Sequence, residues 1–179
     1  GIKYQRLEFQ LDSIDKAYKK NTEDRQKAYE QKRDSTKMAK EKAEKDYIQM
    51  INDVKSKPYT ETERDFAGNW EFKSEKIYTK DEILIFFEEF KVNTDRTYTY
   101  KSYFKKWLEN PVYKEYTEKG IWEIKDNTFY AYINEENGQP SKRIDPLKFD
   151  EISKKKASRT VQLFIDTPSV KVNGKKVSE

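Results

Sequence analysis

Apolar positions follow two different periods along this sequence. Up to residue 57 they are sparse and lie mostly three or four residues apart among charged residues, whereas from residue 66 onward they alternate with polar residues in short runs. The first spacing places side chains on one face of a helix, and alternation places them on one face of a strand. We therefore predict an α+β fold, in which a long charged helix over 1–57 precedes a small antiparallel β-barrel or sandwich over 66–179.

The helical segment contains no proline and, after Gly1, no glycine. Its first apolar residues have the spacing of a coiled-coil seam: Leu7, Leu11, Ile14 and Tyr18. The seam lapses among charged residues and resumes out of phase at Ala39, Ala43, Tyr47, Met50 and Val54. Two interpretations follow. Residues 7–54 form a coiled coil that makes a homo-oligomer, or the helix is a solvated spacer whose apolar ends dock nearby.

Pro58 ends the predicted helix, because proline lacks an N–H donor and disfavours helical backbone in the residue before it. Residues 58–65 are mostly polar and are expected to form a linker.

Short alternating runs at residues 97–103, 128–133 and 161–165 predict strands. Ile83–Phe90 is predicted as a strand too, although the preceding Thr79-Lys80-Asp81-Glu82 also fits a helix capping box. Residues 104–118 are expected to form a long loop. Turn-forming residues separate the runs, and they lie at 93–96, 125–127, 136–140 and 172–175.

Composition restricts the chemistry that this chain can perform. Its 37 basic and 33 acidic residues leave a net charge of +4, interleaved along the chain, so no nucleic-acid partner is expected. The absence of Cys and His excludes thiol nucleophiles, Ser-His catalysis and zinc sites of the Cys/His kind. The adjacent acids Glu88-Glu89 and Glu135-Glu136 would point to opposite faces of a strand. We therefore expect a protein that is not an enzyme and has no metal or cofactor.

Three motifs, in this order, resemble lipocalins and bacterial lipocalin-like domains. Gly68-Asn69-Trp70-Glu71-Phe72 is similar to the Gly-x-Trp of their first strand, and residues 90–100 (FKVNTDRTYTY) resemble their hairpin. Gly120-Ile121-Trp122-Glu123-Ile124 resembles their central strand. The resemblance covers residues 66–165. Departures are the long stretch 102–119, the preceding helix, and the family's arginine over the opening tryptophan, for which Arg159 is one candidate.

The resemblance implies a barrel whose interior has room for a small apolar ligand. Candidate ligand contacts in the interior are Trp70, Phe72, Trp122 and Ile124. A second set, Tyr98, Tyr100, Tyr130 and Tyr132, would form an aromatic surface if strands 97–103 and 128–134 lie near one another. The alternatives are ordinary core packing for the first set and cross-strand pairing for the second.

Our first hypothesis is a binding module, in which the helix holds a lipocalin-like domain that binds a small apolar ligand or a protein partner. A chain that begins at Gly1 is what removal of a signal peptide or membrane anchor would leave, so we expect a bacterial envelope or secreted protein, with a cytoplasmic location left open. The alternative is a structural adaptor, which oligomerises through the helix and has a filled β core without a ligand cavity.

Overall fold

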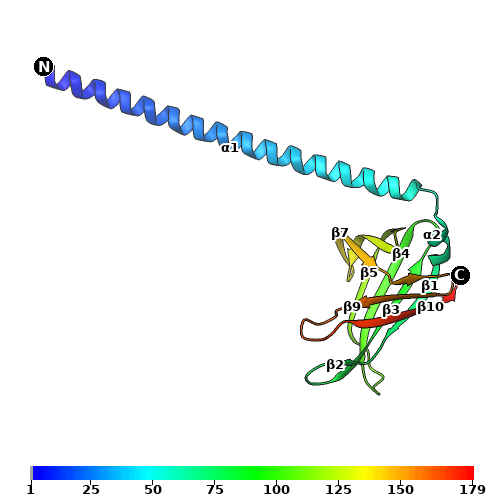
Figure 1. Ribbon diagram of the computed structural model, residues 1–179. Helices are drawn as coiled ribbons and strands as arrows, with labels where there is room; N and C mark the ends of the chain where they lie inside the picture. The colour runs from blue at the N-terminus through cyan, green and yellow to red at the C-terminus, as the bar shows by residue number, and fades with distance from the viewer. Residues whose placement is uncertain (1) are drawn as a thin grey trace. The chain divides into compact units, whose positions relative to one another are not determined.

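The computed structural model describes residues 2–179, which form two helices and one antiparallel sheet of ten strands (Figure 1). The helices are α1 (Ile2–Ser56) and α2 (Glu61–Phe66). The strands are β1 (Gly68–Ser74), β2 (Ile77–Tyr78), β3 (Ile83–Val92), β4 (Thr97–Lys106), β5 (Tyr113–Lys125), β6 (Thr128–Glu136), β7 (Gln139–Lys148), β8 (Glu151–Ile152), β9 (Lys156–Val161) and β10 (Val170–Ser178). The predicted α+β fold is confirmed, and the sheet curls into a half-barrel.

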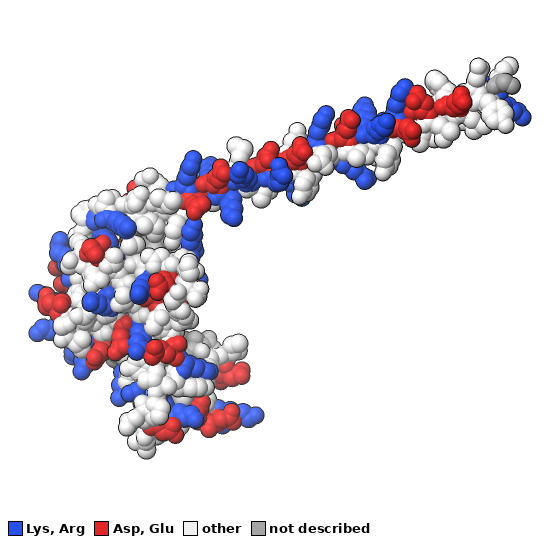
Figure 2. All heavy atoms as spheres, turned by 180° about the vertical axis from the view of Figure 1, so that it is seen from behind, with Lys and Arg blue, Asp and Glu red and all other residues white. Residues whose placement is uncertain are grey.

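The chain divides into two compact units, of which the first ends at Gln49 and the second comprises Met50–Glu179. In the first unit, the α1 side chains of residues 2–46 are all exposed. Basic and acidic side chains alternate along this helix, and uncharged side chains gather toward its N-terminal end (Figure 2). The first unit therefore has no buried apolar core among the residues that are described.

Strands β3 to β7 follow one another as a meander, and the first strand, β1, lies within the sheet rather than at its edge. Neighbouring strands follow the order β7-β6-β5-β4-β3-β1-β10-β9-β8, and β2 pairs with β3 beside this path. β1 is hydrogen-bonded to β3 on one side and to the C-terminal β10 on the other. The predicted turns at 125–127 and 136–140 are confirmed: residues 126, 127, 137 and 138 have the positive φ angles that tight hairpins require.

In β1, β4 and β10, buried residues alternate with more exposed ones, and the buried residues face the interior of the half-barrel and form much of its core. In β1, Trp70 and Phe72 are buried whereas Glu71 and Lys73 are exposed. Phe66, the last residue of α2, has no exposed surface, and its ring centroid lies 5.0 Å from that of Trp70. The short helix therefore contributes an aromatic side chain to the centre of the core.

A buried ion pair fixes α2 to the sheet. The Thr60 side chain accepts the Glu63 N–H, and the Glu63 carboxylate accepts the Thr60 N–H, which makes a complete capping box. The same carboxylate pairs with Arg96 and accepts the N–H of Ile124. Burial alone would raise the pKa of Glu63, but the hydrogen bonds from Arg96 and the backbone lower it. These contacts explain why residues 61–65, expected as part of a linker, are helical.

Other local predictions have mixed outcomes. The strand at Ile83–Phe90 is confirmed within β3. The loop expected at 104–118 is wrong in extent, because Phe104 pairs with Tyr113 across an irregularity and most of the segment joins β4 and β5. The turn expected at 172–175 is also wrong, since β10 runs straight through it, and the strand expected at 161–165 ends at its first residue.

Candidate functional site

Six of the eight predicted ligand-contact residues face the interior and pack into the hydrophobic core: Trp70, Phe72, Tyr98, Tyr100, Trp122 and Ile124. Their exposed fractions range from 0% to 9%. The ring of Trp122 stacks on that of Phe129, with centroids 5.9 Å apart and an interplanar angle of 3°. These side chains contact one another across the interior, which is what the core-packing alternative describes.

The other two predicted residues, Tyr130 and Tyr132, lie on the opposite face of the sheet. Tyr132 packs with Val54 and Ile121 in a second, smaller cluster, and Tyr130 lies against that cluster. The Tyr132 hydroxyl donates to the buried Glu123 carboxylate at 2.7 Å. The two tyrosine pairs therefore do not share a surface, because β5 separates their strands and Tyr98 and Tyr100 face inward.

A buried acid–base pair bridges strands that are not neighbours in the sheet. Glu88 on β3 has no exposed surface, and its carboxylate accepts two hydrogen bonds from the Arg159 guanidinium on β9. The Tyr100 hydroxyl donates to the same carboxylate at 2.6 Å. Burial would lower the pKa of Arg159, but the Glu88 charge raises it, while burial and Glu88 both raise the pKa of Tyr100. The interior thus holds a fully paired charge.

A second polar cluster surrounds Glu118 on β5, which is 4% exposed. The Tyr98 hydroxyl lies 2.9 Å from one carboxyl oxygen of Glu118. The Tyr116 hydroxyl oxygen lies 2.7 Å from the other and 2.6 Å from a carboxylate oxygen of Glu136, which also pairs with Arg143. One hydroxyl hydrogen cannot serve both acids. Burial raises the pKa of Glu118, whereas Arg143 and Tyr116 lower that of Glu136 to about 2, so of the two acids Glu118 is the one that holds a proton more readily.

The arginine expected over the opening tryptophan is not Arg159, whose guanidinium is held by the buried acid. The ammonium of Lys176 lies 5.5 Å from the ring centroid of Trp70 instead. An arginine does lie over the second tryptophan of the motifs, since the Arg96 guanidinium is 5.5 Å from the ring centroid of Trp122. The cation beside the opening tryptophan is therefore Lys176 and not Arg159.

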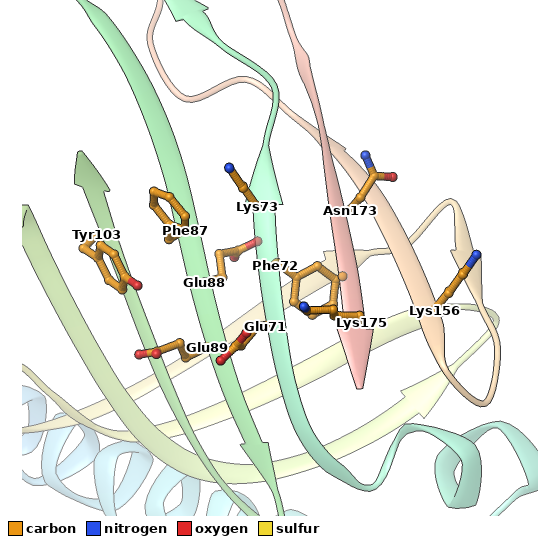
Figure 3. A pocket seen from close by; sticks show the side chains of 11 residues that line it. Glu71, Phe72, Lys73, Phe87, Glu88, Glu89, Tyr103, Lys156, Asn173 and Lys175 are labelled. Atoms are coloured by element: carbon orange, nitrogen blue, oxygen red, sulfur yellow. The ribbon is translucent and has the colours of Figure 1, made fainter. Parts of the chain in front are cut away.

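A groove lies on the outer face of the sheet over β4, β3, β1 and β10 (Figure 3). Its volume is about 610 Å³, and ligand sites commonly have roughly 300–1,000 Å³. Phe87 and Tyr103 form one side, and Asn173, Lys175 and Lys156 lie on the other. The side chains that border it come mainly from the positions that alternate with core residues.

The aromatic side of the groove is surrounded by lysines. The rings of Phe87 and Tyr103, opposite one another on β3 and β4, stack with centroids 5.2 Å apart and an interplanar angle of 12°. The ammonium groups of Lys73 and Lys105 lie 5.8 and 5.5 Å from the Phe87 centroid, and that of Lys101 lies 5.6 Å from the Tyr103 centroid. These distances are within the range of cation–π attraction.

A row of charged side chains crosses the sheet beside these rings. Glu89 lies opposite Glu71, which also lies opposite Lys175, and Lys175 in turn lies opposite Lys156. Like charges that face each other across strands are destabilising. Among residues 2–179, neither Lys156 nor Lys175 takes part in an ion pair. The lysine pair therefore offers two ammonium groups at the edge of the groove.

The sequence analysis missed the groove residues because it looked for a ligand inside the barrel. Strand geometry contained the necessary signal: neighbours in a strand point to opposite faces, so if Phe86 and Phe90 face the core, Phe87 faces outward. The same argument applies to Tyr103, which follows the inward-facing Ser102. Pairing these two outward rings required the β3–β4 register, which the sequence alone did not give.

Residues 2–179 contain no group of three or more acidic, His or Cys side chains placed to hold a metal ion. None of the helices within this range is long and apolar enough to span a membrane. No protein-family model matches the chain, and no curated protein matches its sequence.

Proposed function

We propose that this chain is a non-enzymatic binding module that holds a small, flat ligand carrying a negative charge in the outer groove of its half-barrel. The observation that carries the proposal is the stacked pair of Phe87 and Tyr103, which is bordered by lysines within a hollow of ligand size. A flat apolar ring can lie against this wall, since aromatic pairs contribute about 0.5–1.5 kcal/mol beyond the area they bury.

The charges around the groove support an anionic group on the ligand. Lys73 lies between the aromatic wall and Asn173 (Figure 3), and the unpaired lysines Lys156 and Lys175 border the far side. A hydrogen bond from an ammonium group to a carboxylate or sulfonate is stronger than one between neutral groups. Glu71 and Glu89 lie together at the lower border of the groove in Figure 3, so we place the anionic group away from them.

The packing of the interior supports a site on the outside. The rings expected to contact a ligand within a lipocalin-like barrel fill the space between the strands, and Trp70, Phe72 and Trp122 are at most 1% exposed. A ligand in that space would have to displace core side chains, each of which stabilises the fold by several kcal/mol, on the order of the 3–5 kcal/mol measured for aromatic truncations. The lipocalin resemblance thus concerns the scaffold, and the groove is where we place binding.

The state of the buried acids supports a role without catalysis. Glu88 is occupied by Arg159 and Tyr100, Glu123 by Tyr132 and lysines, and Glu63 by its own helix cap and Arg96. A general acid or base must reach the reacting group, and these carboxylates are committed to internal partners. The location at the cell envelope stays a prediction that rests on the sequence.

The proposal can be tested with three probe compounds and the full chain. Naphthalene-2-sulfonate carries a flat ring and an anion, naphthalene-2-methanol carries the ring alone, and hexanesulfonate carries the anion alone. We expect two-dimensional NMR spectra to show saturable shifts at Phe87 and Tyr103 that are strongest with naphthalene-2-sulfonate. Phe87→Leu should weaken its binding several-fold because the stacking surface is lost, and Lys73→Gln should weaken the sulfonate more than the methanol.

Tyr78→Leu is the matched control, because Tyr78 is an exposed tyrosine outside the groove and its loss should leave binding unchanged. Unaltered binding by Phe87→Leu would refute the groove as the site. Shifts confined to Trp70 and Trp122 would move the site to the interior instead. Stronger binding of the neutral methanol would keep the groove but refute the anionic class of ligand.

The filled interior also favours a second candidate, the structural adaptor without a ligand cavity. On this alternative the groove is a surface without an occupant, and the β domain serves to carry the helix. The same titrations separate the two functions, since an adaptor would show no saturable shift with any of the three probes.

A further inference from the structure

We infer that residues 4–21 of α1 pair with the same residues of a second copy of this chain, as a parallel, in-register coiled coil. Five large side chains repeat there at a and d spacing: Tyr4, Leu7, Leu11, Ile14 and Tyr18. Their exposed fractions lie between 55% and 77%. A helix that leaves such a seam in water gains by covering it, because burial of apolar area is the main favourable term in association.

Residues 2–46 of α1 have no buried side chain that could stabilise the helix. Side chains from residue 2 to residue 46 are all exposed, so no tertiary packing supports this length of helix. Helices in water depend on packing of an apolar face rather than on propensity, since a single long helix frays. A partner for the seam is therefore needed to account for a stable helix here.

The C-terminal end of the second apolar run of α1 is covered by the half-barrel, and its exposed members Ala39 and Ala43 are small. Val54 is 2% exposed and packs with Ile121 and Tyr132 of the half-barrel, and Met50 and Ile51 lie against this cluster. We therefore place the homo-oligomer interface, expected over residues 7–54, at the N-terminal seam, where the exposed side chains are large. It ends where polar residues take over the a and d positions, at Asn21 and Arg25.

The charged residues beside the seam favour a second copy of this chain as the partner, and they favour a parallel orientation of the two helices. In a parallel pair, the g position of one helix meets the following e position of the other. Lys3 would then meet Glu8 of the second copy, and Gln10 would meet its Asp15. An antiparallel pair centred on the same seam would instead bring Glu8 against Asp15, two like charges. A second copy in parallel therefore satisfies both the apolar seam and the charges.

Sedimentation equilibrium of the full chain across a range of concentrations tests the pairing. We expect a reversible monomer–dimer equilibrium that Leu11→Lys weakens at least tenfold, because it places a like-charged pair in the seam. Phe9→Lys is the matched control: Phe9 is 76% exposed on the same helix but occupies an outer f position. It should leave the dissociation constant within about twofold of the parent chain.

The direction is tested by disulfide trapping, for which the chain offers a background without cysteine. Leu7→Cys should form a disulfide-linked dimer readily, because in-register d positions face one another at bridging distance. Phe9→Cys should not form such a dimer.

A parent chain that stays monomeric, or equal weakening of the dimer by the two lysine variants, would overturn the pairing. A dimer in which Leu7→Cys fails to cross-link would overturn the parallel arrangement. None of these residues lies in the groove, so the outcome is independent of ligand binding.

Discussion

The guanidinium of Arg159 holds the carboxylate of Glu88 across the interior, although their strands are not paired. β1 and β10 lie between β3 and β9 in the sheet, so the ion pair spans the inside of the curl. With Tyr100 as a third member, the cluster satisfies a carboxylate that has no contact with solvent. The cluster therefore ties β3 to β9 across the curl of the sheet.

Removing one member of this pair should destabilise the fold far more than removing both. Arg159→Met leaves a buried carboxylate without its counter-charge, which typically costs about 3–5 kcal/mol. The triple variant Glu88→Met, Arg159→Met, Tyr100→Phe removes every polar member and should recover much of this loss. Urea unfolding followed by circular dichroism measures each free energy. Equal losses in the single and triple variants would contradict a cost caused by an unpaired charge.

Glu118 should be protonated in the folded state at pH values where a free glutamate is ionised. Its neighbours are Tyr98, Tyr116, Arg143 and Asp145, and burial is the largest cause of its raised pKa. A raised pKa means that the folded state holds more protons, so this group lowers the free energy of unfolding as the pH rises through the window from its ordinary value of 4.5 upward. Carbon-13 NMR of the Glu118 carboxyl group measures the pKa directly.

The variant Glu118→Gln mimics the neutral acid and should lose this pH dependence. We expect its free energy of unfolding at pH 7 to equal or exceed that of the parent chain, since the amide has no proton to take up on folding. At pH 4, where the parent acid is neutral too, the two proteins should differ less in stability than they do at pH 7. A variant that is much less stable at pH 7 would show that the ionised carboxylate stabilises the fold, which contradicts a raised pKa of Glu118.

The pair of Glu63 and Arg96 should behave in the opposite way with pH. Burial raises the pKa of Glu63, but the stronger combined effect of its hydrogen bonds lowers it. Its stabilising effect is therefore complete above the ordinary glutamate value and is lost as the pH falls through the lowered pKa. Glu63→Gln should reduce stability at pH 7 and flatten the acid limb of the stability curve. Thermal unfolding between pH 2 and pH 7 compares the two proteins.

Much of the fold follows from local sequence patterns. Alternation in residues 128–133 places Phe129, Ala131 and Ile133 on the buried face, and tight turns at 126–127 and 137–138 set the hairpins. The change from a spacing of three or four residues to alternation of apolar and polar residues likewise distinguishes the helical part of the chain from the sheet. These elements depend on neighbours within a few residues, and for that reason the sequence alone predicts them.

The parts that the sequence analysis missed depend on contacts between distant residues. Residues 61–66 are an exception in part: their capping box of Thr60 and Glu63 is a local signal, whereas the contact of Glu63 with Arg96, 33 positions away, holds the helix against the sheet. The predicted interior residues are placed on the correct face, yet whether a ligand or other side chains fill that interior depends on how far the sheet curls. The groove wall needs the β3–β4 register to bring Phe87 and Tyr103 together.

Gly174 should be required for packing rather than for a turn, as its place within β10 indicates. A Cβ atom at this position would overlap the ring of Phe72, a fully packed core side chain on the neighbouring β1. Gly174→Ala should therefore reduce the free energy of unfolding by about 1–3 kcal/mol, the usual cost of overpacking. Urea unfolding with fluorescence of the buried tryptophans measures this loss.

Two further variants show whether the cause is the contact with Phe72. Asn173→Ala changes the adjacent, outward-facing position and should alter stability by less than about 0.5 kcal/mol. Phe72→Leu shortens the side chain beneath the glycine, so the cost of Gly174→Ala should be smaller in that background than in the parent chain. Such a non-additive result is expected for residues in direct contact. If the two losses simply added, the strain would have to arise elsewhere along β10.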